Sequence, residues 1–363
     1  MSTGRKMYSF SNRANPEFFT TLKARVNEYF ETNKIDRHGD HRIIIKSVLM
    51  FLLYLVPYAL IFTPLAENTL IFIGCWVAMA FGAVGLGVNV MHDANHGSFS
   101  KNKKLNAIMG RCLNLIGGNA RTWKLQHNVL HHTYTNIEGM DQDIDVPGVL
   151  RFSPHQERRW FHRFQFIYAW FLYGLQTFMR TIITDFANAY KYKKQGLVRN
   201  KAEYRRLMTS VVGWKTFYWI YALALPLIFS PAPFWLVLIG FATMHFIAGL
   251  LMAIIFQSAH VMPDCEFPLP NEKGSMANNW AVHQLQTTTN FSPKSKVFSW
   301  FVGGLNYQIE HHLFANICHT HYRDISKIVS STAKEFGVQY NMQKSFVRAI
   351  WEHGRMLKRL GTA

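Results

Sequence analysis

Long apolar stretches separated by short polar turns dominate the pattern along this chain. Each of the two turns, residues 63–69 and 230–233, joins a pair of these stretches, and neither turn contains a lysine or an arginine. The four stretches carry few charges and are about as long as a helix that crosses a bilayer: residues 43–62, 70–91, 214–229 and 234–256. We therefore predict an all-α integral membrane protein with about four transmembrane helices.

The polar segments are expected to share one side of the membrane. An even number of spans returns the chain to its starting side, so residues 1–42, residues 92–213 and the segment after Gln257 would lie together. Basic residues collect in these segments, and the positive-inside rule makes their side the cytoplasm. The pattern thus predicts a multi-pass membrane protein with both termini in the cytoplasm.

The N-terminal region, residues 1–42, precedes a main membrane domain of residues 43–363 in this interpretation. It contains one predicted amphipathic helix, in which apolar residues recur at helical spacing at Phe19, Leu22, Val26 and Phe30. Such a helix either lies on the membrane surface or packs against its own protein, and the sequence leaves both interpretations open.

Composition and charge narrow the class of partner. The chain has 363 residues, a net charge of +18 and 49% apolar residues. This charge suits nucleic acid or the anionic inner face of a membrane. The basic residues flank apolar stretches and form no recognisable nucleic-acid-binding module, so we expect membrane lipids and no nucleic acid. The four cysteines form no CxxC motif, which argues against an iron–sulfur cluster.

Histidines gather outside the apolar stretches, in three clusters and one single position. They are His92 and His96; His127, His131 and His132; His260; and His311 and His312. On an α-helix, His127 and His131 would share one face, while His132 would turn about 100° away. Neutral imidazole is the commonest metal ligand, and eight imidazoles are too many for one metal ion but suit two. Imidazole binds iron, copper, zinc and nickel alike, so the ligand type does not choose the metal.

These clusters resemble the three histidine boxes of the membrane fatty acid desaturases. The boxes read HDANH at 92–96, HNVLHH at 127–132 and QIEHH at 308–312, in order and between suitably placed spans. The likeness continues through residues 133–136, 280–291 and 311–322, and covers most of the chain. Gln308, where many relatives have histidine, resembles the front-end subgroup, which makes Δ5 or Δ6 double bonds. The family usually has proline after the Leu-Phe of the third box, where this chain has Ala315.

The resemblance implies a mushroom-shaped helical fold, with a di-iron site in a cytosolic helical cap beside a tunnel for the acyl chain. It implies that the metal ligands are His92, His96, His127, His131, His132, His260, His311 and His312. The amide oxygen of Gln308 could approach a metal weakly or through water. Four carboxylates could orient the imidazoles through the nitrogen that does not bind metal, although the last three could equally be solvated loop residues: Asp93, Asp141, Asp143 and Asp145.

The activity that the resemblance implies fits the chemistry of an unactivated CH₂ group. Such a group has no acidic proton and no leaving group, so only a strong oxidant attacks it. The resemblance implies two iron ions, O₂ as co-substrate and a cis double bond introduced into an acyl-lipid or acyl-CoA. Two electrons must come from outside. Neither a dinucleotide fingerprint nor a fused haem module of the cytochrome b5 kind is recognisable, so we expect a separate ferredoxin or cytochrome b5 as donor.

Three other functions stay open at this point. A di-iron hydroxylase on the same scaffold would begin with the same hydrogen abstraction. A membrane zinc metalloprotease would use HDANH as a distant version of HExxH, with Asp93 in place of the glutamate base. A histidine-rich metal transporter would hold its ligands near the bilayer midplane, whereas these clusters lie outside the predicted spans. The double-bond position, the acyl carrier, the donor and the oligomeric state do not follow from the sequence.

Overall fold

The chain folds into two compact units, both mostly helical. The computed structural model describes residues 8–11, 15–146 and 148–363, so residues 1–7 and 12–14 of the predicted N-terminal region lie outside the described part. The first unit contains His41–Leu125 and Trp170–Ala253. The second unit contains the described residues up to Asp40, together with Gln126–Ala169 and Ile254–Ala363.

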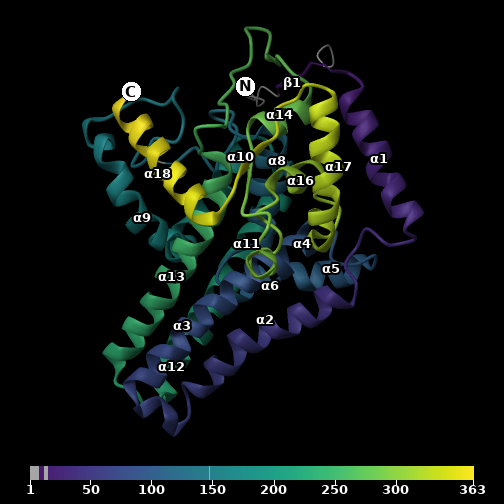
Figure 1. Cartoon of the computed structure of the whole chain (residues 1–363). Coiled ribbons are helices and arrows are strands. Elements are labelled where there is room, and N and C mark those ends of the chain that lie inside the picture. Colours follow the sequence, from purple (N-terminus) through teal and green to yellow (C-terminus); the bar gives the residue numbers. More distant parts are fainter. Residues whose placement is uncertain (1–7, 12–14, 147) are drawn as a thin grey trace. The chain divides into compact units, whose positions relative to one another are not determined.

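The first unit contains most of the long apolar helices (Figure 1). Along the chain its elements are α2 (His41–Leu60), η1 (Pro64–Glu67), α3 (Thr69–Gly85), η2 (Leu86–Met91), α4 (His92–His96), α5 (Lys103–Gly110), α6 (Cys112–Leu115), α7 (Ala120–Lys124), η5 (Arg180–Thr184), α10 (Asp185–Lys194), α11 (Lys201–Trp219), η6 (Ile220–Ala224) and α12 (Leu225–Phe229). Two further helices begin in one unit and end in the other, α9 (Gln165–Met179) and α13 (Phe234–His260).

Four continuous helical runs in the described residues are long and apolar enough to cross a membrane. They are His41–Leu60, Thr69–His96, Lys201–Phe229 and Phe234–His260. This confirms the predicted helical class with four candidate spans. Three runs extend clearly beyond the predicted apolar stretches: the second continues through His96 and the fourth through His260. The third begins at Lys201, where the Asn200 side chain accepts from the Glu203 amide. Backbone hydrogen bonding continues a helix through polar residues, so an apolar pattern marks only part of it.

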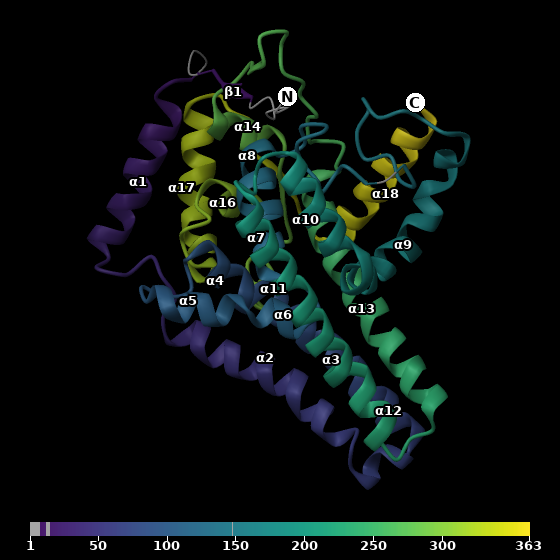
Figure 2. The same ribbon diagram turned by 180° about the vertical axis from the view of Figure 1, so that it is seen from behind.

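Helices α2 and α3 run side by side in both views (Figures 1 and 2). Gly82 of α3 lies against the backbone of α2, because a Cβ atom at this position would be 2.7 Å from the backbone nitrogen of Tyr54. The absence of a side chain lets the two backbones approach closely, as small residues do between membrane helices.

A buried ion pair joins three elements of the first unit. Lys215 Nζ of α11 lies 2.5 Å from Asp185 Oδ2 of α10 and also donates to the carbonyl oxygens of Gly117 and Arg180. Asp185 Oδ1 accepts a hydrogen bond of 2.7 Å from the Thr122 hydroxyl of α7. Loss of one partner would leave a buried charge, which typically costs about 3–5 kcal/mol. The pair therefore fixes the position of α7 against α10 and α11.

The second unit contains shorter helices and two pairs of parallel strands, in which Ser9 aligns with Ser275 and Thr289 aligns with Asn341. Along the chain its elements are β1 (Ser9–Phe10), α1 (Phe18–Thr32), η3 (Leu125–His131, which begins at the boundary), α8 (His132–Tyr134), η4 (Trp160–Phe164), β2 (Ser275–Met276), α14 (Trp280–Gln286), β3 (Thr289–Phe291), α15 (Lys296–Phe301), α16 (Gln308–Leu313), η7 (His319–His321), α17 (Tyr322–Glu335), β4 (Asn341–Gln343) and α18 (Phe346–Thr362).

The N-terminal helix α1 packs against its own protein. It lies beside α17 in both views (Figures 1 and 2). Leu22, Val26 and Phe30 are buried as the helical spacing predicts, and Phe18 joins them in the core of the second unit. The predicted fourth residue, Phe19, is only partly buried against this core. Of the two interpretations that the sequence left open, the structure supports packing within the protein.

We expect Gly82→Ala to lower the midpoint of thermal unfolding of the detergent-solubilised protein. The new methyl group would press on the α2 backbone, and overpacking of this kind costs about 1–3 kcal/mol. The matched control is Gly74→Ala in the same helix, because a Cβ there meets nothing within 4 Å. Equal midpoints for the two variants would contradict the close approach of α2 and α3.

Candidate metal centre

Three histidines from distant parts of the sequence form a buried cluster in the second unit. His131 ends η3, His260 ends α13 and His312 lies in α16. One ligand atom from each lies within 4.8 Å of the others, and the ring centroids are 4.7 to 4.9 Å apart. The three side chains are at most 3% exposed. Burying three imidazoles this close together is expected of ligands to one metal ion.

Asp141 fixes the orientation of His131. Its carboxylate accepts from His131 Nδ1 at 3.0 Å and from the backbone amides of Asn136 at 2.9 Å and Asp143 at 3.0 Å. Burial alone would lower the pKa of His131, but the carboxylates of Asp141 and Asp143 raise this pKa to about 9. Burial opposes the charge on Asp141, yet His131 holds the pKa of Asp141 below its usual range. With one proton held on Nδ1, a metal ion would take the place of the proton on Nε2.

His260 and His312 are oriented in the same way. His260 Nδ1 donates to the Thr287 carbonyl oxygen at 3.2 Å, and His312 Nδ1 donates to Gln284 Oε1 at 2.8 Å. Both partners are acceptors, so Nδ1 carries the proton and Nε2 keeps its lone pair. His260 Nε2 is buried and makes no hydrogen bond to any part of the chain that the structure describes. A buried nitrogen with an unused lone pair is costly, and a bound metal ion would satisfy it.

The turn after the second box connects these histidines. Asn136 has a φ of 57°, in the left-handed region that asparagine tolerates better than most residues. Its side-chain amide donates to the carbonyl oxygens of His260 at 3.0 Å and Glu266 at 3.1 Å. The same residue offers its backbone amide to Asp141. One asparagine therefore positions both the end of α13 and the carboxylate that orients His131.

A second group of imidazoles, also in the second unit, adjoins the first. The Nε2 atoms of His127 and His132 lie 3.1 Å apart, and the ring centroid of His311 is 4.5 Å from that of His132. All three side chains are buried. Two nitrogens bound at about 2.1 Å to one ion lie about 3 Å apart, so this spacing suits a shared metal. The Nδ1 atom of His311 lies 3.3 Å from the Tyr322 hydroxyl.

The second box forms a π-helix where an α-helix was expected. The rings of His127 and His131 do stack, with centroids 5.3 Å apart. The prediction that His132 would turn away from His127 is wrong. In a π-helix the hydrogen bonds join residues five apart, so residues i and i+5 come onto one face. His127 and His132 therefore face each other, while His131 contributes to the first cluster.

His92 and His96 lie in the first unit. They begin and end the short helix α4, and their ring centroids are 4.8 Å apart, as the i, i+4 spacing predicts. The ring of Trp123 is 5.7 Å from each of them. A π-helix, η2, directly precedes α4. Gly97, with a φ of 80°, then ends the helix.

The four candidate carboxylates differ in their surroundings. Asp141 contacts His131 directly, and Asp143 Oδ2 lies 3.4 Å from His131 Nδ1. Asp93 is buried beside its neighbour His92, with a distance of 4.0 Å from its Oδ1 to His92 Nδ1. Asp145 is exposed. The structure thus supports an orienting contact for Asp141 and places Asp145 on the surface.

The third box contains two further buried polar residues. Gln308 is 1% exposed, and its Nε2 makes no hydrogen bond within the described residues. Glu310 was not predicted from the sequence. Its carboxylate accepts from Asn290 Nδ2 at 2.7 Å and from the Tyr340 hydroxyl at 2.8 Å, and burial raises its pKa to about 7. These bonds tie α16 to β3 and to the segment before β4.

Sequence reasoning also missed Gln284 and Thr287, the acceptors for His312 and His260. Both lie in or directly after α14, within residues 280–291, where the chain resembles the desaturases beyond the boxes. That resemblance was the only signal for these two residues, because hydrogen-bond acceptors such as carbonyl and amide oxygens form no recognisable sequence motif. His283 lies on the same helix, and its Nε2 donates to the Thr135 carbonyl oxygen at 2.9 Å. Burial lowers the pKa of His283 to about 4, so its ring is neutral.

We expect Asp141→Asn to reduce the metal bound per chain, because an amide neither holds the Nδ1 proton of His131 as firmly nor balances its charge. Loss of such a partner typically lowers metal affinity about 10–100-fold. The control is Asp145→Asn, which removes the same charge from an exposed position four residues later. Metal content is measured after dialysis against a graded series of chelator concentrations. If both variants retained the same amount of metal at each chelator concentration, Asp141 would have no orienting role.

Comparison with known proteins agrees with the motifs. The family model described as fatty acid desaturase matches residues 67–344. An acyl-lipid (8-3)-desaturase of Physcomitrium patens is 36% identical over 97% of this chain and 73% of its own length. An sn-1 linoleoyl-lipid 6-desaturase of Synechocystis sp. is 34% identical over 95% of this chain and 96% of its own length. A Delta(5) fatty acid desaturase A of Dictyostelium discoideum is 29% identical over 95% of this chain and 75% of its own length.

The matched residues include all three histidine boxes and His260. The chain has four helices able to cross a membrane and buried histidine clusters able to hold metal ions. It belongs to the fatty acid desaturase family.

Proposed function

We propose that this protein is an O₂-dependent di-iron acyl desaturase of the front-end type, which introduces a cis double bond between an existing double bond and the carboxyl end. The observation that carries the proposal is the cluster of His131, His260 and His312, in which each Nδ1 is held by an acceptor, so that each Nε2 is the nitrogen left for a metal ion. This is the arrangement that metal-binding histidines require. Imidazole binds several metals, so we infer iron from the family and not from the ligands.

The proposed ligands fall into two groups. His131, His260 and His312 would hold one iron. His127, His132 and His311 would contribute to the other, because the first two share a nitrogen separation that suits one ion. We propose His92 and His96 as ligands too, on the resemblance and on their paired rings. Gln308 is buried, and we propose that its amide oxygen approaches a metal weakly or through a water molecule.

The reaction needs the protein for positioning more than for acid–base chemistry. When bound, the two irons supply with O₂ the oxidising power that an unactivated CH₂ group requires. The chain's own part is to orient the imidazoles, by holding the proton on Nδ1 of each ring through Asp141, the Thr287 carbonyl and Gln284. Every one of these orienting contacts is buried, which excludes water and strengthens each hydrogen bond. An acyl chain held beside such a site would present one C–C bond to it.

The substrate class follows from relatives. The moss and cyanobacterial proteins are named as acyl-lipid and linoleoyl-lipid desaturases, so we propose an acyl-lipid substrate here. The cyanobacterial and Dictyostelium relatives are named as a 6-desaturase and a Delta(5) desaturase, and such positions agree with Gln308 at the start of the third box. Two electrons per turnover would come from a ferredoxin or a cytochrome b5.

We further propose that the histidine clusters and both termini lie on the cytoplasmic side, within a helical cap. The turns at residues 61–68 and 230–233, which follow the first and third candidate spans, contain no lysine or arginine. The basic residues lie in the segments on the other side of the spans, which the positive-inside rule assigns to the cytoplasm. A basic cytoplasmic face would attract an acidic electron donor.

We expect alanine at His131, His260 or His312 to abolish product, because each substitution removes one of three ligands from the same buried cluster. The control is His41→Ala, at an exposed residue that begins α2. Desaturated lipid is measured in a host that expresses each variant, with membrane insertion checked by fractionation. Full activity in one of the three variants would remove that histidine from the ligand set.

The type of reaction is tested by feeding defined mono- and di-unsaturated fatty acids to the expressing host and mapping the double bonds of the extracted lipids. We expect a new cis bond at Δ5 or Δ6, on the carboxyl side of the existing one. A hydroxylated product would identify a di-iron hydroxylase instead. A new bond on the methyl side would contradict the front-end assignment.

A further inference from the structure

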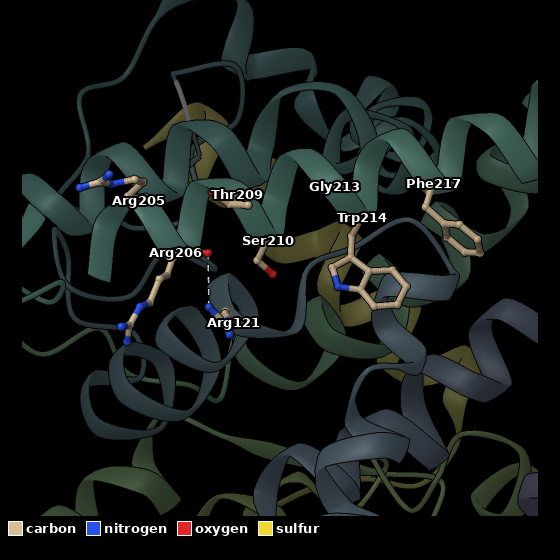
Figure 3. A pocket seen from close by; sticks show the side chains of 8 residues that line it. All are labelled: Arg121, Arg205, Arg206, Thr209, Ser210, Gly213, Trp214 and Phe217. Carbon is tan, nitrogen blue, oxygen red and sulfur yellow. Dashed lines mark hydrogen bonds between the residues drawn. The ribbon is translucent and has the colours of Figure 1, made fainter. Parts of the chain in front are cut away.

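A groove in the first unit has a basic end and an aromatic end (Figure 3). It has a volume of about 730 Å³ and lies along α11, beside α7. Its lining includes Arg121, Arg205, Arg206, Ser210, Trp214 and Phe217. None of the eight predicted histidine ligands lines it.

Helical spacing explains why these side chains meet. Arg206, Ser210, Trp214 and Phe217 follow one another at intervals of four, four and three residues, which keeps them on one face of α11. Figure 3 shows Arg206, Ser210 and Trp214 on the side of α11 that faces Arg121. The groove therefore follows the axis of α11, from guanidinium groups at one end to aromatic rings at the other.

The walls of the groove are held in place. Arg121 Nη1 donates to the Arg206 carbonyl oxygen at 3.3 Å, and Asn119 Nδ2 donates to Ser210 Oγ at 3.3 Å. On the buried side of α11, Lys215 is locked to Asp185. The groove is thus a feature of the packed structure, in which α7 and α11 are joined at several points.

The basic end carries positive charge without a counter-ion. Among the described residues no carboxylate lines the groove, and Arg121, Arg205 and Arg206 form no ion pair. The buried carboxylate of Asp185 is already paired with Lys215. Guanidinium groups bind phosphate through paired hydrogen bonds, and a neighbouring hydroxyl such as Ser210 can add another. A phosphate therefore has the chemistry that these side chains can bind.

The aromatic end argues for a lipid rather than for a free anion. Helix α11 opens the candidate membrane span Lys201–Phe229, so the groove descends from the charged start of a span toward its apolar part. Phe217 is 46% exposed, and Trp214 is partly exposed. Aromatic rings below basic residues are typical of the membrane interface, and basic pockets between membrane helices bind anionic head groups.

We propose that this groove binds one anionic glycerophospholipid. Arg121, Arg205 and Arg206 hold its phosphate, and one acyl chain lies along Trp214 and Phe217. The site is separate from the proposed metal ligands, and it does not depend on the desaturase chemistry.

The test is native mass spectrometry of the full-length protein in a neutral detergent, titrated with phosphatidylglycerol and, separately, with phosphatidylcholine. We expect one tightly retained phosphatidylglycerol per chain. The double variant Arg205→Gln/Arg206→Gln is expected to bind it about tenfold more weakly, since charge-assisted hydrogen bonds are lost. Trp214→Ala is expected to weaken binding about fivefold, through lost apolar contact with the acyl chain.

The matched control is Lys103→Gln/Lys104→Gln, which removes the same charge from an exposed part of the first unit outside the groove. It should retain the lipid as the unaltered protein does. Circular dichroism and gel filtration confirm that each variant is folded.

Three results would overturn the proposal. Equal loss of lipid in the two charge variants would show that binding follows net charge and not the groove. Displacement of the lipid by millimolar inorganic phosphate, with no effect of Trp214→Ala, would identify a free-anion site. Unchanged lipid binding in Arg205→Gln/Arg206→Gln, together with a raised KM for an acidic electron donor, would identify a protein-docking surface.

Discussion

Buried histidines can serve as metal ligands only if one nitrogen of each ring is already satisfied by the protein. An imidazole ring has two nitrogens. A buried ring that can change its tautomer or rotate would bind metal poorly. In this chain three acceptors of different kinds hold the proton on Nδ1 and fix the orientation of each ring. Asp141 is a carboxylate, Thr287 offers a backbone carbonyl and Gln284 offers a side-chain amide. The rest of the second unit is arranged so that these acceptors reach their rings.

This requirement explains features that are otherwise unrelated. Asn136 adopts a left-handed conformation, and its side chain donates to the His260 carbonyl oxygen at the end of α13, which positions His260. The backbone amide of Asn136 donates to the Asp141 carboxylate. The short helix α14 carries Gln284, and Thr287 follows directly after it. Glu310, held by Asn290 and Tyr340, fixes α16 from its other side. Apart from the local bond between Asn136 and Asp141, these contacts join segments that are 20 or more residues apart in the sequence, so the geometry of the cluster depends on the folded unit.

The sequence predicted the elements that depend on local pattern. Apolar length located four candidate spans, and histidine spacing located the paired and tripled histidines, because these signals are contained within a few turns of helix. His260 stands alone in the sequence, and only the resemblance to the desaturases pointed to it. The orientation of His132 was predicted wrongly, since nothing in HNVLHH distinguishes a π-helix from an α-helix. Gln284 and Thr287 could not be predicted from spacing, because a hydrogen-bond acceptor becomes visible only when the chain folds back on itself. The basic groove along α11 was missed for a similar reason: its arginines come from two helices that lie more than eighty residues apart.

The central claim is that the histidine clusters hold two iron ions. The most direct measurement is elemental analysis of the purified full-length protein, combined with Mössbauer spectroscopy of a sample grown on ⁵⁷Fe. The account predicts two irons per chain, with a Mössbauer spectrum of nitrogen-ligated, non-haem iron. One zinc per chain would contradict it. So would an iron content that stays the same when His131 or His312 is mutated.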